Sequence, residues 1–200
     1  MKKILIATGN QHKAKEIGRI LGELEVEWKT TQDFNETTDV EETGKTFEAN
    51  AQLKAHVWHR NTQLFTIADD SGLEVDAMGG RPGVRSARYA KTPEMRIQKL
   101  LAELEGIPTE KRTARFVCVA CVVTEDGEEI LSRGVVEGRI ASEVKGEGGF
   151  GYDPVFIPNG FDGRHMAELT DEEKDEVSHR GLAMRGLLPK LRELVAKDGQ

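Results

Sequence analysis

Long hydrophobic runs are absent from this sequence of 200 residues. No stretch approaches the roughly 18 consecutive apolar residues that a membrane-spanning helix needs, so we expect no membrane partner. The apolar run near the N-terminus stops at Thr8 and is too short for the hydrophobic region of a secretory signal. The sequence therefore predicts a cytoplasmic location.

An excess of basic residues is also missing. The chain has 28 Lys and Arg against 35 Asp and Glu, which gives a formal net charge of −7. General nucleic-acid binding depends on Lys and Arg that neutralise many phosphates, so we expect no nucleic-acid partner. A small polyanion stays compatible with this charge if an acidic site recruits a divalent cation and a few basic residues converge.

Cysteine is scarce, and its placement excludes a disulfide. Cys118 and Cys121 lie in a run, 116–123, that is apolar on both faces of a predicted strand. Their odd spacing places them on opposite faces, roughly 10 Å apart along the strand, which is beyond the reach of a disulfide. We interpret both as buried structural thiols.

The chain has no Pro/Gly/Ser-rich linker, internal repeat or low-complexity tract, and its hydrophobic and charged fractions of 38% and 32% are ordinary. The length fits a single domain over residues 1–200 with two lobes. Strand and helix patterns alternate, which predicts an α/β fold with a mixed, twisted sheet flanked by helices. The predicted strands are 3–7, 26–29, 64–68, 115–124 and 129–140.

Capping residues mark the predicted helices. Asn10 begins a helix that extends to about Leu24, Thr46 begins one to about Asn61, and an acidic polar loop fills 30–44. Thr92 caps a third helix, and the capping box at 170–173 opens a helical region to 197 that is kinked near Pro189. The residues expected to face inward on the third helix are Met95, Leu100, Leu101 and Leu104.

The segment 68–73 carries the strongest chemical signal. An apolar strand, 64–68, ends at Asp69, Asp70 and Ser71. Ligands of open α/β sheets gather at the carboxyl ends of strands, so this pattern predicts a metal site. The alternative is that one or both aspartates only begin a turn by bonding to their own backbone. The residues alone leave both interpretations open.

Other clusters suit a metal-bound phosphate and a purine. Thr8, Gly9 and Asn10 form a strand-to-helix turn whose amides attract anions, and Lys13 adds a charge. Glu41 and Glu42 could bring a carboxylate to Asp70, a donor set that suits Mg²⁺. The alternative for each is an ordinary solvated charge.

Two further clusters lie in the second half of the chain. Gly148–Asp153 combines close backbone approach with Phe150, a ring able to stack on a base. Lys174 and Ser178–Arg180 offer groups for phosphate and carbonyl oxygens. Core packing and surface charge are the plain alternatives.

Three tempting motifs carry less weight. Gly146, Gly148 and Gly151 match G-x-G-x-x-G, but the residues that follow cannot open a helix. Residues 44–46 lack the first glycine of a phosphate-binding P-loop. The pair of histidines at 56 and 59 has no further ligand, so we interpret both as solvated helix residues.

Taken together, these blocks resemble the inosine triphosphate pyrophosphatases over essentially the whole chain. Small departures occur at 165–166 and at Asp175. The matching blocks are 7–10 with Lys13, 42–44 with 46–47 and 50–51, 68–89, 148–156, 167–169, Lys174 and 178–181.

The resemblance implies hydrolysis of ITP, dITP and XTP to the monophosphate and pyrophosphate with Mg²⁺. It implies that Asp70 is the general base or water-positioning group and a metal ligand, and that Glu41 is a second ligand, with Glu42 and Asp69 as alternatives. It further implies a homodimer and two lobes around a central nucleotide-binding cleft. The substrate-binding residues it implies are Thr8, Gly9, Asn10, Lys13, Ser71, Phe150, Gly151, Tyr152, Asp153, Lys174, His179 and Arg180.

Selectivity has a physical basis in this interpretation. Hypoxanthine and xanthine present an O6 acceptor where adenine presents an amino donor. Donors from His179, Arg180 or the backbone would pair with O6 and reject adenine. Two alternatives stay open: a Maf-type pyrophosphatase with a pyrimidine or modified-nucleotide preference, and a nucleotide-binding sensor without catalysis.

Overall fold

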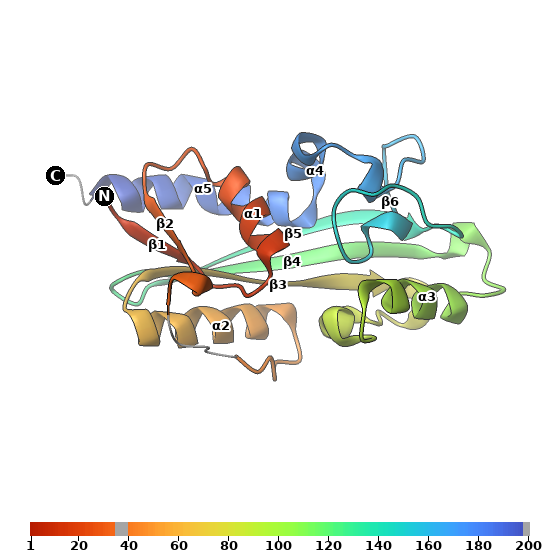
Figure 1. Ribbon diagram of the computed structural model, residues 1–200, viewed down its shortest axis with the longest axis horizontal. Helices are drawn as coiled ribbons and strands as arrows, with labels where there is room; N and C mark the ends of the chain where they lie inside the picture. The colour runs from red at the N-terminus through yellow and green to blue at the C-terminus, as the bar shows by residue number, and fades with distance from the viewer. Residues whose placement is uncertain (35–39, 198–200) are drawn as a thin grey trace. The chain divides into compact units, whose positions relative to one another are not determined.

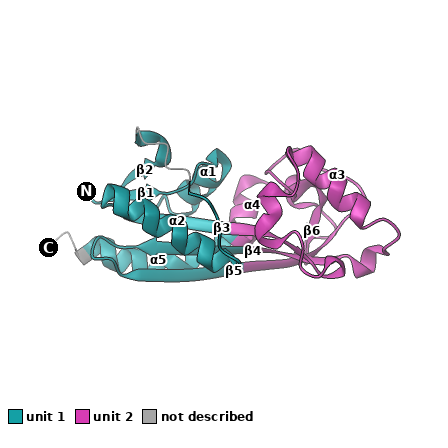
Figure 2. Cartoon of the chain, turned by 90° about the horizontal axis from the view of Figure 1, so that it is seen from below, with its two compact units in different colours: residues 1–70, 118–134, 180–200 teal, residues 71–117, 135–179 magenta. Residues whose placement is uncertain are grey.

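The computed structural model describes residues 1–34 and 40–197, so part of the predicted acidic loop, 35–39, lies outside the described residues. The chain divides into two compact units (Figure 2). Unit 1 consists of 1–70, 118–134 and 180–200, and unit 2 of 71–117 and 135–179. These units correspond to the two predicted lobes. The nucleotide-binding cleft and the single functional domain stay predictions.

One six-stranded sheet has the order β2-β1-β3-β4-β5-β6 (Figure 1). Strand β1 runs parallel to β2 and to β3, whereas β5 and β6 are antiparallel. The prediction of an α/β fold with a mixed sheet is confirmed. The strands are β1 (Lys3–Ile6), β2 (Glu27–Thr30), β3 (Phe65–Val75), β4 (Thr113–Val123), β5 (Glu129–Ile140) and β6 (Phe156–Pro158).

The helices begin where their capping residues predicted. The Asn10 side chain accepts hydrogen bonds from the amides of His12 and Lys13, and Thr46 and Thr92 cap the next two helices. The capping box at Thr170 is also present. The α-helices are α1 (Gln11–Ile20), α2 (Phe47–Thr62), α3 (Pro93–Glu103), α4 (Asp171–Val177) and α5 (His179–Lys197).

Strand β3 corrects the prediction at the aspartates. The strand continues through Asp69 and Asp70 to Val75, so neither a strand end nor a turn occurs there. The carboxylates are tolerated inside a buried strand because side chains from the helices on both faces donate hydrogen bonds to them. A strand pattern read from apolar residues alone cannot include these tertiary partners.

The C-terminal helical region is divided at Ser178, which the sequence did not predict. Ser178 has extended backbone angles and separates α4 from α5. Pro189 lies inside α5, and the kink predicted near it stays a prediction. The first helix ends at Ile20, earlier than Leu24. On α3, Met95 is 46% exposed and Ile97 is buried in its place.

Each unit has its own hydrophobic core. The core of unit 1 is built from β1, β3, β4, α1 and α5, and that of unit 2 includes Leu73, Leu100, Phe116 and Phe156. Within unit 1, α1 and α5 lie on one side of the strands and α2 lies on the other (Figure 1). Both cysteines are buried and free, as predicted.

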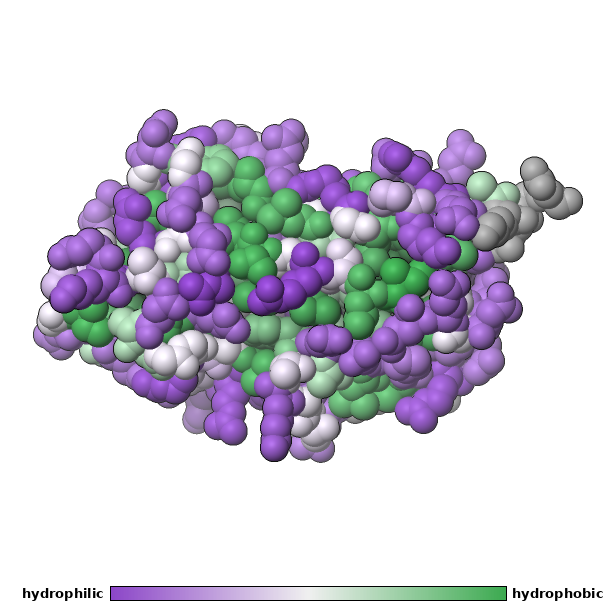
Figure 3. Space-filling view, turned by 180° about the vertical axis from the view of Figure 1, so that it is seen from behind, coloured by the Kyte–Doolittle hydropathy of each residue, from purple (hydrophilic) through white to green (hydrophobic). Residues whose placement is uncertain are grey.

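The surface carries few large apolar side chains. Purple, hydrophilic residues cover most of the face in Figure 3, with patches of green, hydrophobic residues, in keeping with a mean hydropathy of −0.50. Among the described residues, no helix is long and apolar enough to cross a membrane.

Candidate functional site

Strand β3 presents Asp69 and Asp70 to opposite faces of the sheet in unit 1. Successive side chains of a strand alternate between faces, which separates the two carboxylates. Asp69 meets the side that holds α1 and α5, through Lys13 and Arg180. Asp70 meets α2, through Asn50. Two neighbouring residues of the same type therefore have different surroundings.

On the α2 side, Asp70 is 4% exposed and receives a hydrogen bond from Asn50 Nδ2 to its Oδ2 at 2.9 Å. The Lys54 ammonium lies 3.8 Å from Asp70 Oδ1 and donates to Glu42 Oε1 at 2.7 Å. Burial raises the pKa of Asp70, and the Glu42 charge acts in the same direction, while Lys54 opposes them. A raised pKa suits a carboxylate that accepts a proton.

Helix α2 places these partners through its own spacing. Asn50 and Lys54 are one turn apart and therefore share a helix face. The side-chain oxygen of Asn50, Oδ1, accepts a hydrogen bond from the backbone amide of Gly44 at 2.7 Å. This bond joins the loop that carries Glu42 to the helix. A side chain at Gly44 would collide with Asn50 Oδ1 at 2.5 Å. The glycine thus permits the close approach.

The Asp70 side fits a divalent cation by the chemistry of its donors. The Lys54 ammonium already bridges Glu42 and Asp70, so the pair attracts positive charge. Among the described residues, no group of three or more His, Cys, Asp or Glu is arranged to hold a metal. Mg²⁺ is commonly held by one or two carboxylates together with water and substrate phosphates, so a pair of carboxylates is sufficient. Glu41 is exposed, and Glu42 is the residue joined to Asp70 through Lys54.

On the opposite face, Asp69 Oδ2 is the meeting point of several donors. Lys13 Nζ lies at 3.0 Å, Arg180 at 3.1 Å and Cys118 Sγ at 3.7 Å. Burial alone would raise the pKa of Asp69, but the charges of Lys13 and Arg180 outweigh it and hold that pKa far below its usual range. The lowered pKa keeps the Asp69 carboxylate ionised at neutral pH.

The turn predicted to bind phosphate joins β1 to α1. The Asn10 side chain occupies the amides of His12 and Lys13, and the Asn10 amide donates to Thr8 Oγ1 at 3.2 Å. Lys13 is oriented toward Asp69. The turn thus combines a helix N-terminus with a cation that is held in place.

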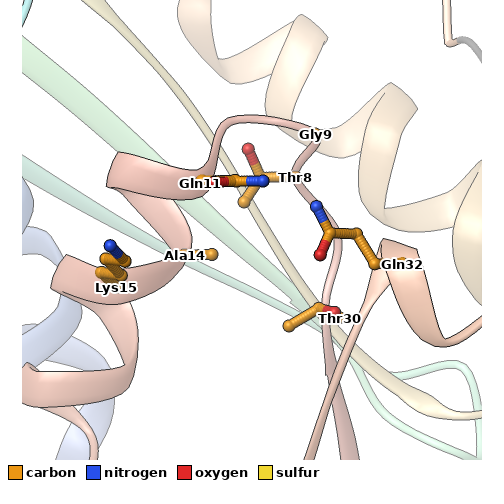
Figure 4. Close-up of a pocket in the computed structure, with 7 residues that line it drawn as sticks. All are labelled: Thr8, Gly9, Gln11, Ala14, Lys15, Thr30 and Gln32. Atoms are coloured by element: carbon orange, nitrogen blue, oxygen red, sulfur yellow. The ribbon is translucent and has the colours of Figure 1, made fainter.

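An open pocket of about 240 Å³ borders this turn (Figure 4). Lys13 is not among its lining residues, because Lys13 lies on the other face of α1. The cations and carboxylates that bear on function meet around Asp69 and Asp70 and do not line this pocket. The pocket is lined by Thr8, Gly9, Gln11, Ala14, Lys15, Thr30 and Gln32.

In unit 2, the glycine-rich segment forms a compact charged turn. Asp153 Oδ2 accepts from Lys174 Nζ and from the Phe150 amide, both at 2.8 Å. The Lys174 ammonium lies 4.8 Å from the centre of the Phe150 ring, within range of a cation–π interaction. Gly149 has a φ of +69°, and a Cβ there would collide with Asp153 Oδ2. Only glycine fits this position.

The aromatic residues near this turn are held by packing. Tyr152 is buried, and its hydroxyl donates to the Ser86 carbonyl at 3.0 Å. The His179 ring stacks on Phe116 with centroids 4.8 Å apart and an angle of 13°. His165, which departs from the family pattern, is buried with Nδ1 at 2.6 Å from the Pro154 carbonyl.

The structure joins part of the predicted site within each unit. Unit 1 brings together Lys13, Asp69 and Arg180 on one face of β3 and places Asp70 on the other, and unit 2 brings together Phe150, Asp153 and Lys174. Ser71 and Gly151 are half-buried, and their predicted roles stay predictions.

Two charged residues of the unit 1 site, Glu16 and Lys54, were not predicted from the sequence. Glu16 receives a hydrogen bond from Arg180 at 2.6 Å, and Lys54 joins Glu42 to Asp70. Helical spacing could have indicated both, since Glu16 lies one turn after Lys13 and Lys54 one turn after Asn50.

Comparisons with known proteins agree on one family. The chain is 47% identical over 204 residues to a dITP/XTP pyrophosphatase of Geobacillus kaustophilus (strain HTA426), covering 100% of this chain and 99% of the relative. It is 49% identical over 191 residues to the dITP/XTP pyrophosphatase of Bacillus subtilis (strain 168), covering 94% and 96%.

Solved structures give the same result. A HAM1 protein from Coxiella burnetii matches with a TM-score of 0.86 at 40% identity, covering 96% of this chain and 100% of that one. A nucleoside-triphosphatase / dITP/XTP pyrophosphatase from Mycobacterium abscessus matches with a TM-score of 0.75 at 47% identity, covering 94% and 99%. Since the family model also matches residues 4–190, this chain belongs to the Ham1 family.

Proposed function

We propose that this chain hydrolyses dITP, XTP and ITP to the nucleoside monophosphate and pyrophosphate. The observation that carries the proposal is the placement of Asp70, a buried carboxylate with a raised pKa that shares the Lys54 ammonium with Glu42. The names of the full-length relatives, dITP/XTP pyrophosphatases, support the same substrates. We treat the whole chain as one functional domain.

Asp70 is the group that takes or orients the proton of the attacking water in this proposal. Burial makes the carboxylate more basic than an exposed one, and Asn50 fixes its orientation through Oδ2. The other carboxylate oxygen of Asp70, Oδ1, then faces the Lys54 ammonium. Water attacks the α-phosphorus, and pyrophosphate leaves.

The triphosphate is held by Lys13 beside the turn Thr8–Asn10. The backbone amides of Thr8 and Asn10 already donate to the Ile6 carbonyl and to Thr8 Oγ1, so the turn contributes through the dipole of α1, and Lys13 supplies a full charge. Phosphoryl transfer depends mainly on positioning and electrostatic stabilisation, so a fixed cation at this point contributes directly.

Mg²⁺ is the proposed cofactor, with Asp70 and Glu42 as the residues that would hold it. Glu41, named by the resemblance, is exposed and stays an alternative. When bound, the ion neutralises charge that develops on the leaving pyrophosphate. The Lys54 ammonium lies between the same two carboxylates and would move aside when the ion binds.

Phe150 offers a ring that could stack on the base. Lys174, which the resemblance assigns to the triphosphate, has its ammonium held in place by Asp153. Both roles stay predictions. Discrimination between O6 and an amino group needs hydrogen-bond donors, and the candidates are backbone amides and His179. A homodimer and a cytoplasmic location remain predictions from the sequence.

A substrate panel tests the proposal. Pyrophosphate release with Mg²⁺ is measured from ITP, XTP, dITP, ATP, GTP and dTTP, with and without added inorganic pyrophosphatase. We expect intact pyrophosphate from ITP and XTP at least about 100-fold faster than from ATP in kcat/KM. Orthophosphate as the first product would indicate a phosphatase, preference for dTTP a Maf-type enzyme, and binding without turnover a sensor. Each of these outcomes would contradict the proposal.

A further inference from the structure

Asp69 is bonded in an unusually one-sided way. Its Oδ2 receives Lys13, Arg180 and Cys118, while its Oδ1 is buried and accepts no hydrogen bond from any residue that the structure describes. Buried polar atoms without a partner are rare because leaving them costs free energy. Asp69 therefore holds its three donors with Oδ2 alone, while Oδ1 receives no hydrogen bond from the described residues.

The second partner of Asp69 is itself fixed. Arg180 is 1% exposed, and it donates one terminal nitrogen to Glu16 at 2.6 Å and the other to Asp69 at 3.1 Å. Glu16 lies one helical turn from Lys13 on α1. The contacts therefore form a closed ring from Lys13 to Asp69, Arg180, Glu16 and back through the helix. The ring contains as many cations as carboxylates, which makes its burial tolerable.

Accessibility decides which member of the ring can meet a ligand. The side chain of Asp69 is 0% exposed and that of Arg180 is 1% exposed, whereas that of Lys13 is 14% exposed. Asp69 therefore has no surface to offer to a metal ion or a phosphate. Lys13, which follows the turn Thr8–Asn10, is the member whose side chain is most exposed.

We propose that Asp69 is a positioning residue that holds the Lys13 ammonium for the triphosphate, with Arg180 and Glu16 bracing Asp69 from behind. Asp69 touches neither substrate nor metal and acts only through Lys13. The inference rests on the proposed function insofar as Lys13 meets the phosphates. It also assigns Arg180, which the sequence placed at the base, to the brace.

A double-mutant cycle tests this coupling. Asp69→Asn keeps the shape of the side chain and removes its charge, and Lys13→Met keeps the stem and removes the ammonium. We expect Asp69→Asn to raise the KM for dITP by about 10- to 100-fold, since a misplacement near 1 Å costs on that order. In the Lys13→Met background, Asp69→Asn should add almost nothing. Equal effects in both backgrounds, or a lower KM in Asp69→Asn, would overturn the proposal.

The Mg²⁺ concentration for half-maximal activity separates positioning from metal binding. It should be unchanged in Asp69→Asn, and a clear rise would assign Asp69 to the metal instead. Asp126→Asn is the matched control, because Asp126 is an exposed residue of the turn between β4 and β5. It should leave every parameter at the wild-type value.

A binding measurement keeps this inference separate from the proposed function. Calorimetry with inorganic tripolyphosphate in EDTA needs no turnover. The unaltered chain should bind the probe, and Asp69→Asn and Lys13→Met should each weaken binding without adding. If wild type hydrolyses no nucleotide but shows this pattern, the proposed function fails and the positioning role stands. No binding by wild type would overturn the role. If Asp69→Asn does not fold, Glu16→Gln takes its place in the same cycle, with a smaller loss expected.

Discussion

Unit 1 and unit 2 bury their charges in different ways. In unit 1, Asp69 gathers cations on one face of β3 while Asp70, the next residue, faces Glu42 and Lys54 on the other. In unit 2, Asp153 and Lys174 form a buried pair, each 3% exposed, beside the Phe150 ring. In unit 1, Asp70, a carboxylate with a raised pKa, lies beside the Lys54 ammonium. In unit 2, the pair of Asp153 and Lys174 keeps a turn rigid. We therefore expect a change at Asp70 in unit 1 to act on turnover, and changes in unit 2 to act on stability and substrate binding.

The largest effect should come from Asp70→Asn. The substitution keeps the hydrogen bond from Asn50 but removes the proton acceptor. We expect kcat for dITP to fall by about 10²- to 10⁴-fold, the usual contribution of general acid–base catalysis. Steady-state kinetics checks this, with Asp126→Asn as the matched control. Turnover close to wild type would remove Asp70 from the mechanism.

Next in size is the loss of the buried pair in unit 2. Lys174→Met keeps the stem of the side chain but leaves the Asp153 carboxylate buried without its cation. Breaking such a pair costs about 3–5 kcal/mol of the free energy of unfolding. Urea denaturation measures it, and KM for dITP should rise more than kcat falls.

Two variants control that experiment. The double variant Asp153→Asn with Lys174→Met should recover most of the lost stability, because no charge remains buried. Glu143→Gln, at the exposed pair with Lys145, should leave the midpoint unchanged. If Lys174→Met were as stable as Glu143→Gln, the contrast between the units would be wrong.

A pair of glycines sharpens the contrast within unit 2. Gly149 and Gly151 have nearly equal positive φ values, +69° and +66°, but only at Gly149 would a Cβ meet Asp153. Alanine at either position carries left-handed strain of about 1–2 kcal/mol. Gly149→Ala should be clearly less stable than Gly151→Ala and should raise KM for dITP further. Equal unfolding midpoints would mean that Asp153 moves aside without cost.

The smallest effect is a difference in pH dependence between Asp69 and Asp70. Asp70 has a raised pKa, so it binds its proton more tightly when folded, and stability falls as the pH rises through and above 3.8. Asp70→Asn should therefore be more stable than wild type at neutral pH and no more stable well below pH 3.8.

Asp69 has the opposite sign. Its pKa is lowered, so its ionised form stabilises the fold above pH 3.8, and this contribution is lost as the pH falls through the lower folded-state pKa. Asp69→Asn should be less stable than wild type at neutral pH, with the difference shrinking in acid. Thermal unfolding in EDTA from about pH 3 to pH 7 measures both variants. Parallel curves for the two variants would contradict the separation of their environments.

Local patterns carried much of the fold. The caps at Asn10, Thr46, Thr92 and Thr170 and the strands β4 and β5 were all predicted, because they depend on residues close in sequence. The break at Ser178 was missed, since nothing in the local propensities of 170–197 requires extended angles there. The roles that the resemblance gives to the site residues stay predictions, whereas the comparisons confirm the family to which that resemblance pointed.

By itself, the sequence determined the α/β alternation, the buried cysteines, the excess of acidic over basic residues and the residue types that a metal-dependent phosphate site would need. Tertiary structure decided the surroundings of each carboxylate. Asp69 and Asp70 are chemically identical, and only the alternation of β3 between α1 with α5 and α2 gives one a lowered pKa and the other a raised pKa. Glu16 and Lys54 entered the site in the same way, because contacts between distant segments depend on packing rather than on spacing along the chain.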